Sequence, residues 1–283
     1  MKPPPFDYHA PVSVAEAVEV LAEAGAHGKV LAGGQSLIPM LNMRLAAPAH
    51  LVDINRVAGL GEISAGPDGV RVGALARHSQ VERSPDACGT LPLLRQALKL
   101  VAHPVIRNRG TVVGSLVHAD PSAELPAVLA LLGGSVRLAS RGGEREVAAA
   151  DFFTGPLESA TRPGELAVSA FFPAWPGGTA FVEVARRHGD FAMAGVAAAV
   201  RLDDDLRVAE ARVACISVGP APVVVDLTAA CGNRPVASMD WRAVVSAVQE
   251  RIEPEADIHA TAEYRRHLTG VLVERAVRAA ADA

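Results

Sequence analysis

Two loops hold the residues of this 283-residue chain that are best suited to bind a ligand. The first is Ala32-Gly33-Gly34-Gln35-Ser36, which follows a short apolar run at Lys29 to Ala32 and opens a helical turn. Consecutive glycine N–H groups can converge on an anion, and a helix N-terminus adds its dipole. The spacing fits a phosphate cradle, and it fits equally well a turn that only joins a strand to a helix.

The second loop runs from Arg109 to Pro126 and combines hydroxyl groups, glycine amides and two carboxylates. Amides and hydroxyls can donate hydrogen bonds to phosphates, while Asp120 and Glu124 can accept them from sugar hydroxyls. The alternative reading treats Asp120 as a neighbour of a helix N-cap and His118 as a buried, hydrogen-bonded histidine. For His118 taken alone, this alternative is favoured.

Other common nucleotide and catalytic motifs are missing. The nearest match to a dinucleotide-binding GxGxxG is Gly59-Leu60-Gly61, which has Ser64 where the third glycine belongs. GxxxxGK[ST], HExxH and GxSxG do not occur. These patterns disfavour NAD binding by that route, nucleotide hydrolysis, zinc catalysis and serine-hydrolase chemistry.

Composition limits the partners and the compartment. Lys plus Arg number 27 against 31 Asp plus Glu, a formal charge of −4, so binding to nucleic acid is not expected. Half of the residues are hydrophobic, which predicts a packed globular core. The longest apolar stretch, Phe191 to Val200, is shorter than the roughly 20 residues that span a bilayer, so no membrane span is expected.

The N-terminus and the cysteines favour a cytoplasmic protein. Residues Met1 to Pro5 lack the charged and apolar pattern of a secretory signal. Cys88, Cys215 and Cys231 have no CxxC spacing, which disfavours a metal site, an iron–sulfur site or a disulfide framework.

The pattern of apolar runs divides the chain into an N-terminal α/β unit, an alternating middle unit and a C-terminal α+β unit. Helical spacing predicts helices at 13–24, 93–101, 123–132, 241–248 and 262–280. Short apolar runs predict strands at 29–32, 51–54, 70–74, 135–139, 165–171, 179–186, 192–202 and 208–218. The segment Pro104 to Pro121 has no clean period and is predicted to be irregular; such a long irregular segment is usually either functional or wrongly assigned. The proline- and glycine-rich residues 173–178 are the best candidate linker.

The two loops resemble those of a known family when they are taken with the segments between them. AGGQS at 32–36 and GTVVGSLVHADPSAELP at 110–126 are accompanied by LVDI at 51–54 and RVGALARHSQVE at 71–82. Together with an RxGDFA-like turn at 187–192, they resemble the FAD-binding medium subunit of molybdenum hydroxylases. Medium subunits of carbon monoxide dehydrogenases and flavin subunits of xanthine dehydrogenases belong to that family.

The resemblance implies an α+β fold with a two-part FAD-binding domain of the vanillyl-alcohol-oxidase (PCMH) type. Its parts would be residues 1–57 and 58–177, followed by a C-terminal domain at 178–283 with a three-stranded antiparallel sheet and a helical bundle. The two loops would clamp the FAD diphosphate, Asp120 and Glu124 would contact the ribityl and adenosine hydroxyls, and the flavin ring would lie near Asp190 and Phe191. The implied cofactor-binding residues are Ala32, Gly33, Gly34, Gln35, Ser36, Leu37, Gly110, Thr111, Gly114, Ser115, His118, Asp120, Glu124, Asp190 and Phe191. Phe191 fits equally well as a core residue at a strand start.

Two positions depart from the family pattern. Val113 stands where the family has a glycine, and a β-branched residue cannot easily adopt a positive φ or let a phosphate approach its backbone. Arg77-His78 replaces the small or hydroxyl residues usual in the family. We expect FAD to bind nonetheless, because Thr111 and Gly114 are present.

The function implied is that of an electron-transfer subunit. FAD would take electrons from an iron–sulfur small subunit, supplied by a molybdenum large subunit, and pass them to an external acceptor, in a heterotrimer or its dimer. The flavin carries the redox chemistry, so no catalytic acid or base and no metal ligand is assigned to this chain. Two alternatives stay open: a free-standing flavin oxidoreductase, and a scaffolding subunit that has lost FAD.

Overall fold

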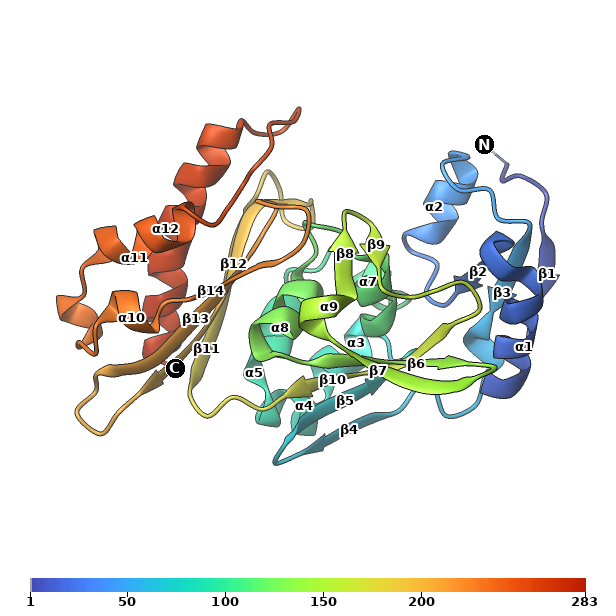
Figure 1. Cartoon of the computed structure of the whole chain (residues 1–283), viewed down its shortest axis with the longest axis horizontal. Coiled ribbons are helices and arrows are strands. Elements are labelled where there is room, and N and C mark those ends of the chain that lie inside the picture. The colour runs from blue at the N-terminus through green and yellow to red at the C-terminus, as the bar shows by residue number, and fades with distance from the viewer. Residues whose placement is uncertain (1) are drawn as a thin grey trace.

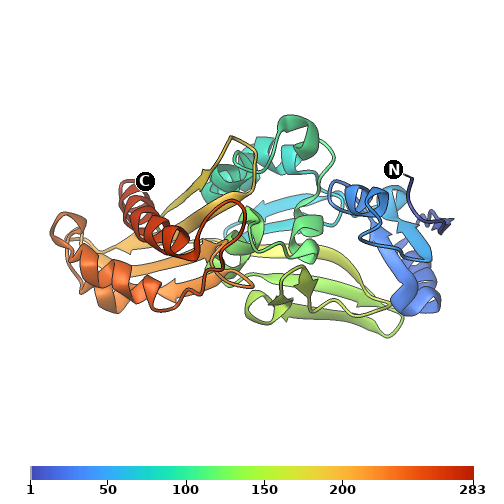
Figure 2. The ribbon, with the colours of Figure 1, turned by 90° about the horizontal axis from the view of Figure 1, so that it is seen from above.

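The computed structural model describes residues 2–283 as three units arranged along the long axis of the molecule (Figure 1). The N-terminal unit lies at one end, the C-terminal unit at the other, and the middle unit between them. The view from above shows the same order (Figure 2).

The N-terminal unit is a three-stranded parallel sheet with a helix packed on it. The strand order is β1 (Asp7–His9), β3 (His50–Asp53), β2 (Gly28–Leu31), with α1 (Val14–Ala24) and α2 (Leu37–Asn42) as its helices. Helix α1 forms as predicted, because the Ser13 hydroxyl accepts a hydrogen bond from the N–H of Glu16 and Gly25 ends the helix at φ 54°. The first strand, β1, has no counterpart among the predicted elements.

The middle unit is a five-stranded antiparallel sheet covered by short helices. The strand order is β4 (Ile63–Gly66), β5 (Gly69–Gly73), β10 (Leu166–Pro173), β6 (Ser135–Ser140), β7 (Gly143–Ala148). The helices are α3 (His78–Arg83), α4 (Pro85–Thr90), α5 (Pro92–Leu98), α6 (Pro104–Arg107), α7 (Val112–His118), α8 (Glu124–Leu132) and α9 (Ala149–Phe152). A small hairpin of β8 (Phe153–Gly155) and β9 (Glu158–Ser159) completes the unit.

The segment at 104–121 was predicted to be irregular, and that prediction is wrong. Residues 104–107 form α6 and residues 112–118 form α7, each begun by a local signal. Pro104 occupies the first turn of α6, and the Thr111 hydroxyl caps α7. Both helices are too short to give a helical repeat in the sequence, which is why periodicity missed them.

The C-terminal sheet has four antiparallel strands, so the expected three-stranded sheet was wrong. Its order is β11 (Gly178–Ala185), β12 (Ala192–Leu202), β13 (Val208–Ile216), β14 (Val223–Asp226). The fourth strand is short and follows Pro220 and Pro222, and proline-rich residues indicate a turn when they are read locally. Helices α10 (Thr228–Cys231), α11 (Trp241–Gln249) and α12 (Ala262–Ala281) follow, and α12 contacts β11 and β12.

The C-terminal sheet is buried on both faces, because it packs against the middle unit on one face and against α11 and α12 on the other. Alternate residues of β12 enter different cores: Ala197 and Ala199 pack with the middle unit, while Val196 and Ala198 pack with α11 and α12. This arrangement explains why β12 is a continuous apolar run instead of an alternating one. Within residues 2–283 the longest helices do not combine the length and apolar character that a membrane crossing needs.

Candidate functional site

The first glycine loop connects β2 to α2, and its backbone N–H groups donate no hydrogen bond within residues 2–283. Gly34 has φ 74°, a conformation that glycine adopts without strain. The Gln35 side chain donates a hydrogen bond to the Gly33 carbonyl at 3.2 Å. Within residues 2–283, no hydrogen bond engages the backbone N–H groups of residues 33–36. Adjacent free amides of this kind can bind an anion.

The second loop is fixed by the N-cap of α7. The Thr111 hydroxyl accepts a hydrogen bond from the N–H of Gly114 at 3.1 Å. A Cβ at position 114 would lie 2.4 Å from that hydroxyl oxygen, so glycine is required there by the cap itself. Among the described residues, the N–H of Val113 has no hydrogen-bond acceptor.

The two loops pack directly against each other. A Cβ on Gly33 would lie 2.4 Å from the Arg109 carbonyl oxygen and 2.8 Å from the Gly110 Cα. Only a glycine permits this approach, because both obstructing atoms belong to the backbone. The contact brings together two segments that are separated by more than seventy positions in the sequence.

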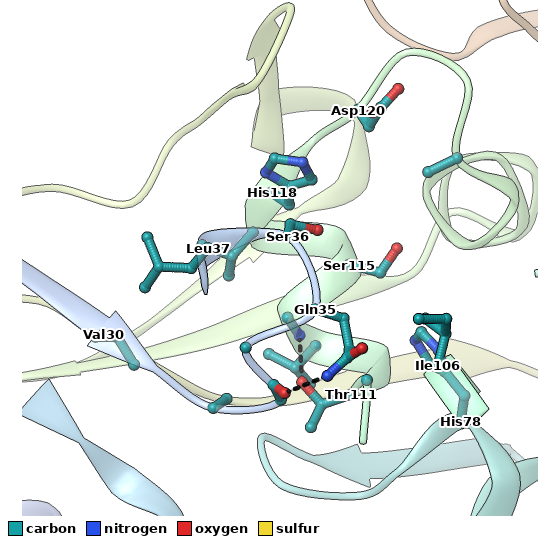
Figure 3. A pocket seen from close by; sticks show the side chains of 18 of the residues that line it. Val30, Gln35, Ser36, Leu37, His78, Ile106, Thr111, Ser115, His118 and Asp120 are labelled. Atoms are coloured by element: carbon teal, nitrogen blue, oxygen red, sulfur yellow. Dashed lines mark hydrogen bonds between the residues drawn. The ribbon is translucent and has the colours of Figure 1, made fainter. Parts of the chain in front are cut away.

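One cavity of about 530 Å³ lies against both loops, within the usual range for small-molecule and cofactor sites. Figure 3 shows His118 and Asp120 at one end of the view, His78 and Ile106 at the other, and the first loop crossing the start of α7. Every residue assigned above to cofactor binding lines it: Ala32, Gly33, Gly34, Gln35, Ser36, Leu37, Gly110, Thr111, Gly114, Ser115, His118, Asp120, Glu124, Asp190 and Phe191. Their contacts with a cofactor stay a prediction.

Some cavity-lining residues were missed by the sequence analysis. Val101, Ala102 and Ile106 line the cavity beside His78. As apolar residues, they carry no sequence signal that separates a ligand-facing wall from an ordinary core.

His78 places an unsatisfied polar side chain in the cavity wall. It is buried, and neither ring nitrogen has a hydrogen-bond partner within residues 2–283. Burial lowers the pKa of His78 to about 4, and the Thr111 backbone, which is near the ring without being hydrogen-bonded to it, opposes this shift only in part. A neutral imidazole whose two nitrogens make no hydrogen bond costs roughly 1–3 kcal/mol of stability, and both nitrogens have almost no exposed surface.

The structure does not support the reading of His118 as a buried, hydrogen-bonded histidine. His118 is half-buried at the end of α7 and lines the cavity. Burial lowers its pKa, and the Asp120 carboxylate opposes this effect. Asp120 itself accepts a hydrogen bond from the N–H of Ser122 at 2.9 Å, so it also shapes the turn before α8.

Two carboxyl groups meet where the middle unit joins the C-terminal sheet. Glu124 is the first residue of α8, and Glu183 lies on β11. Burial raises the pKa of Glu124 to about 8, with further contributions from Glu183 and Asp120. Burial also raises the pKa of Glu183 to about 7, and its Oε2 has no hydrogen-bond partner among the described residues. At neutral pH, Glu124 is therefore a hydrogen-bond donor as well as an acceptor.

The turn before β12, at residues 189–191, forms the part of the cavity wall that comes from the C-terminal unit. Phe191 is 74% exposed and lines the cavity, so it is not a core residue at the strand start. Asp190 lies 3.1 Å from Arg187 and 3.7 Å from Arg186, and its hydrogen bond with Arg187 lowers the pKa of the carboxyl group. Gly189 has φ 85° and packs against the ring of His103.

Val113 does not adopt the positive φ that a β-branched residue would resist. It is the second residue of α7, has no positive φ, and its side chain is 2% exposed. Its side chain packs in the core while its free N–H stays available at the start of the helix.

Val113→Gly is therefore expected to lower the free energy of unfolding by roughly 3 kcal/mol without tightening FAD binding. The loss combines about 1.5–3 kcal/mol of apolar burial with about 1 kcal/mol of helix propensity. Urea unfolding and an FAD titration measure the two effects, and Val113→Ala should fall between Val113→Gly and the wild type in stability. Tighter FAD binding with unchanged stability would show instead that the cradle requires the glycine of the family pattern.

Taken together, the fold and the cavity define a class of protein in which two backbone loops and the turn before β12 line one cavity of cofactor size. Residues 4–175 match the family model described as the FAD binding domain in molybdopterin dehydrogenase. Residues 179–280 match the CO dehydrogenase flavoprotein C-terminal domain. The chain belongs to the family of FAD-binding medium subunits of molybdopterin dehydrogenases, and it is thus an oxidoreductase subunit.

Individual relatives match over nearly the whole chain. The 6-hydroxypseudooxynicotine dehydrogenase complex subunit alpha of Paenarthrobacter nicotinovorans is 39% identical, over 97% of this chain and 94% of that protein. A structure of CO dehydrogenase from Oligotropha carboxidovorans aligns with a TM-score of 0.94 at 32% identity, covering 100% and 99% of the two chains. Quinoline 2-oxidoreductase from Pseudomonas putida 86 aligns with a TM-score of 0.92 at 35% identity, with the same coverage.

Proposed function

We propose that this chain binds FAD in the cavity and transfers electrons from an iron–sulfur subunit to an external acceptor. The observation that carries the proposal is the convergence of two loops with free backbone amides on one cavity. Each hydrogen bond to a charged phosphate contributes roughly 1.5–3 kcal/mol, so a few such amides could hold a diphosphate without a lysine.

In this proposal the residues of the two loops hold the FAD diphosphate. The amides of residues 33–36 and Val113 donate to it, and the Ser115 hydroxyl can add a further donor. Asp120 and Glu124 bind ribityl and adenosine hydroxyls, and His118 lies beside them in the wall. The flavin supplies the two-electron chemistry when it is bound, so the chain needs to hold it, shield it and leave an edge open.

The same proposal covers the finer description of the fold. We assign the two-part FAD-binding domain, residues 1–57 and 58–177, to the vanillyl-alcohol-oxidase (PCMH) type, with the C-terminal domain at 178–283. The match of the family models on either side of residues 175–179 supports the second boundary.

The proposed partner subunits are based on the names of similar proteins. Because similar chains are named as subunits of dehydrogenase complexes, we propose an iron–sulfur small subunit and a molybdenum large subunit, in a heterotrimer or its dimer. The relatives act on different substrates, including carbon monoxide and nicotine, so this chain does not specify the substrate.

Reconstitution of the purified full chain with FAD tests the proposal. We expect one FAD per chain to stay bound after gel filtration and to give the visible flavin absorbance. Absence of bound flavin would favour the scaffolding alternative. Copurification with iron–sulfur and molybdenum subunits is expected as well, whereas a flavin-loaded chain that reduces a substrate alone would favour the free-standing oxidoreductase.

A further inference from the structure

A polar chain of hydrogen bonds links the two glycine loops through two side chains that do not line the cavity. The Asn55 side-chain amide donates to the Ala32 carbonyl at 2.8 Å, which holds the start of the first loop. The Arg77 guanidinium donates through Nη2 to the Asn55 side-chain oxygen at 2.6 Å and through Nη1 to the Arg109 carbonyl at 2.6 Å. One arginine therefore connects the first loop, by way of Asn55, to the second.

The hydrogen bond from Arg77 engages the same Arg109 carbonyl that packs against Gly33 of the first loop. The Arg109 oxygen, which accepts from Arg77, is the atom that a Cβ on Gly33 would meet at 2.4 Å. Two interactions of the Arg109 carbonyl thus set the spacing of the loops: its packing against Gly33 and its hydrogen bond from the Arg77 guanidinium.

The connection is anchored at both ends. Asp53 accepts hydrogen bonds from the Asn55 side chain at 2.6 Å and from the Tyr8 hydroxyl at 2.6 Å, which ties Asn55 to the N-terminal sheet. The backbone next to Arg77 pairs with the second loop, since the N–H of His78 donates to the Gly110 carbonyl at 3.0 Å. Neither Arg77 nor Asn55 lines the cavity, so neither is placed to contact the ligand there.

We infer that Arg77 is a positioning residue that, with Asn55, holds the two loops at the separation that binds the cofactor diphosphate. This inference rests on the proposed FAD binding. An arginine suits this task because its planar guanidinium presents separate donors in a fixed geometry, so a single side chain can engage two acceptors on different segments. Holding the loops before the ligand arrives lowers the ordering cost of binding.

The test compares FAD dissociation constants of full-chain variants by fluorescence titration. Arg77→Met, which keeps the length of the side chain but removes both donors, is expected to raise the FAD dissociation constant by roughly tenfold, about the effect of one lost hydrogen bond. Asn55→Leu removes the other side chain of this hydrogen-bond network and should raise the FAD dissociation constant by a similar factor. It provides an independent test if Arg77→Met folds poorly. The double variant should be no weaker than the weaker single variant, because both changes break one connection.

A matched control separates positioning from general stability. The Arg95 side chain donates to the Glu82 carbonyl at 3.0 Å and does not line the cavity. Arg95→Met should leave the FAD dissociation constant unchanged, and the apoprotein melting temperatures of both variants are recorded alongside. An FAD affinity that is unchanged in Arg77→Met, or additive losses in the double variant, would overturn the inference alone. A wild-type chain that binds no FAD would overturn the proposed function, and this inference with it.

Discussion

Gly33→Ala is expected to weaken FAD binding by at least about a hundredfold, a free-energy loss of nearly 3 kcal/mol. The added Cβ would lie 2.4 Å from the Arg109 carbonyl oxygen and 2.8 Å from the Gly110 Cα. Both atoms belong to the backbone of the second loop, which cannot rotate away as a side chain could. The loops must therefore separate, and amides that converge on one diphosphate would no longer do so.

The measurement is the FAD dissociation constant of the variant, with its melting temperature recorded alongside. Gly61→Ala is the matched control, since a Cβ at Gly61 has no neighbour within 4 Å and the residue has no positive φ. That control should bind FAD like the wild type. If Gly33→Ala kept the wild-type affinity while folded, the contact between the loops would have no role in holding the cofactor.

Glu124→Gln is expected to stabilise the apoprotein at pH 8 by up to about 4 kcal/mol and to leave its stability nearly unchanged at pH 4.5. Burial raises the pKa of Glu124 to about 8 in the folded protein from its ordinary value of 4.5. Between these values the folded state binds more protons than the unfolded state, so the free energy of unfolding falls as pH rises. A shift of this size corresponds to about 5 kcal/mol in full, of which about 4 kcal/mol is lost by pH 8, and coupling to Glu183 makes these upper values.

Urea unfolding of apoprotein at pH 4.5, 6 and 8 measures this dependence. Glu183→Gln should also flatten the pH profile, because it removes a like charge that raises the pKa of Glu124. Glu62→Gln, a change at an exposed position, is the control and should keep the wild-type slope. A Glu124→Gln variant whose stability still falls with pH as steeply as the wild type would show that Glu124 is ionised at neutral pH.

Local sequence signals predicted the longer helices and strands of the fold. Helix α1 was predicted from Ser13, its apolar spacing and Gly25, all of which act within a few residues. The long strands β12 and β13 were predicted from continuous apolar runs. The same local reading missed β14 and both short helices of the 104–121 segment, because a short element is stabilised mainly by what it packs against.

The sequence alone also predicted many of the residues that line the cavity, through two loops whose glycines and hydroxyls resemble a known family. Tertiary structure decided how those loops meet. The contact of Gly33 with Arg109, the link through Arg77 and the charge repulsion of Glu183 on Glu124 join residues far apart in the chain. Local patterns depend on neighbours within a few positions, whereas these contacts, and the pKa shift of Glu124, exist only once distant segments are packed together.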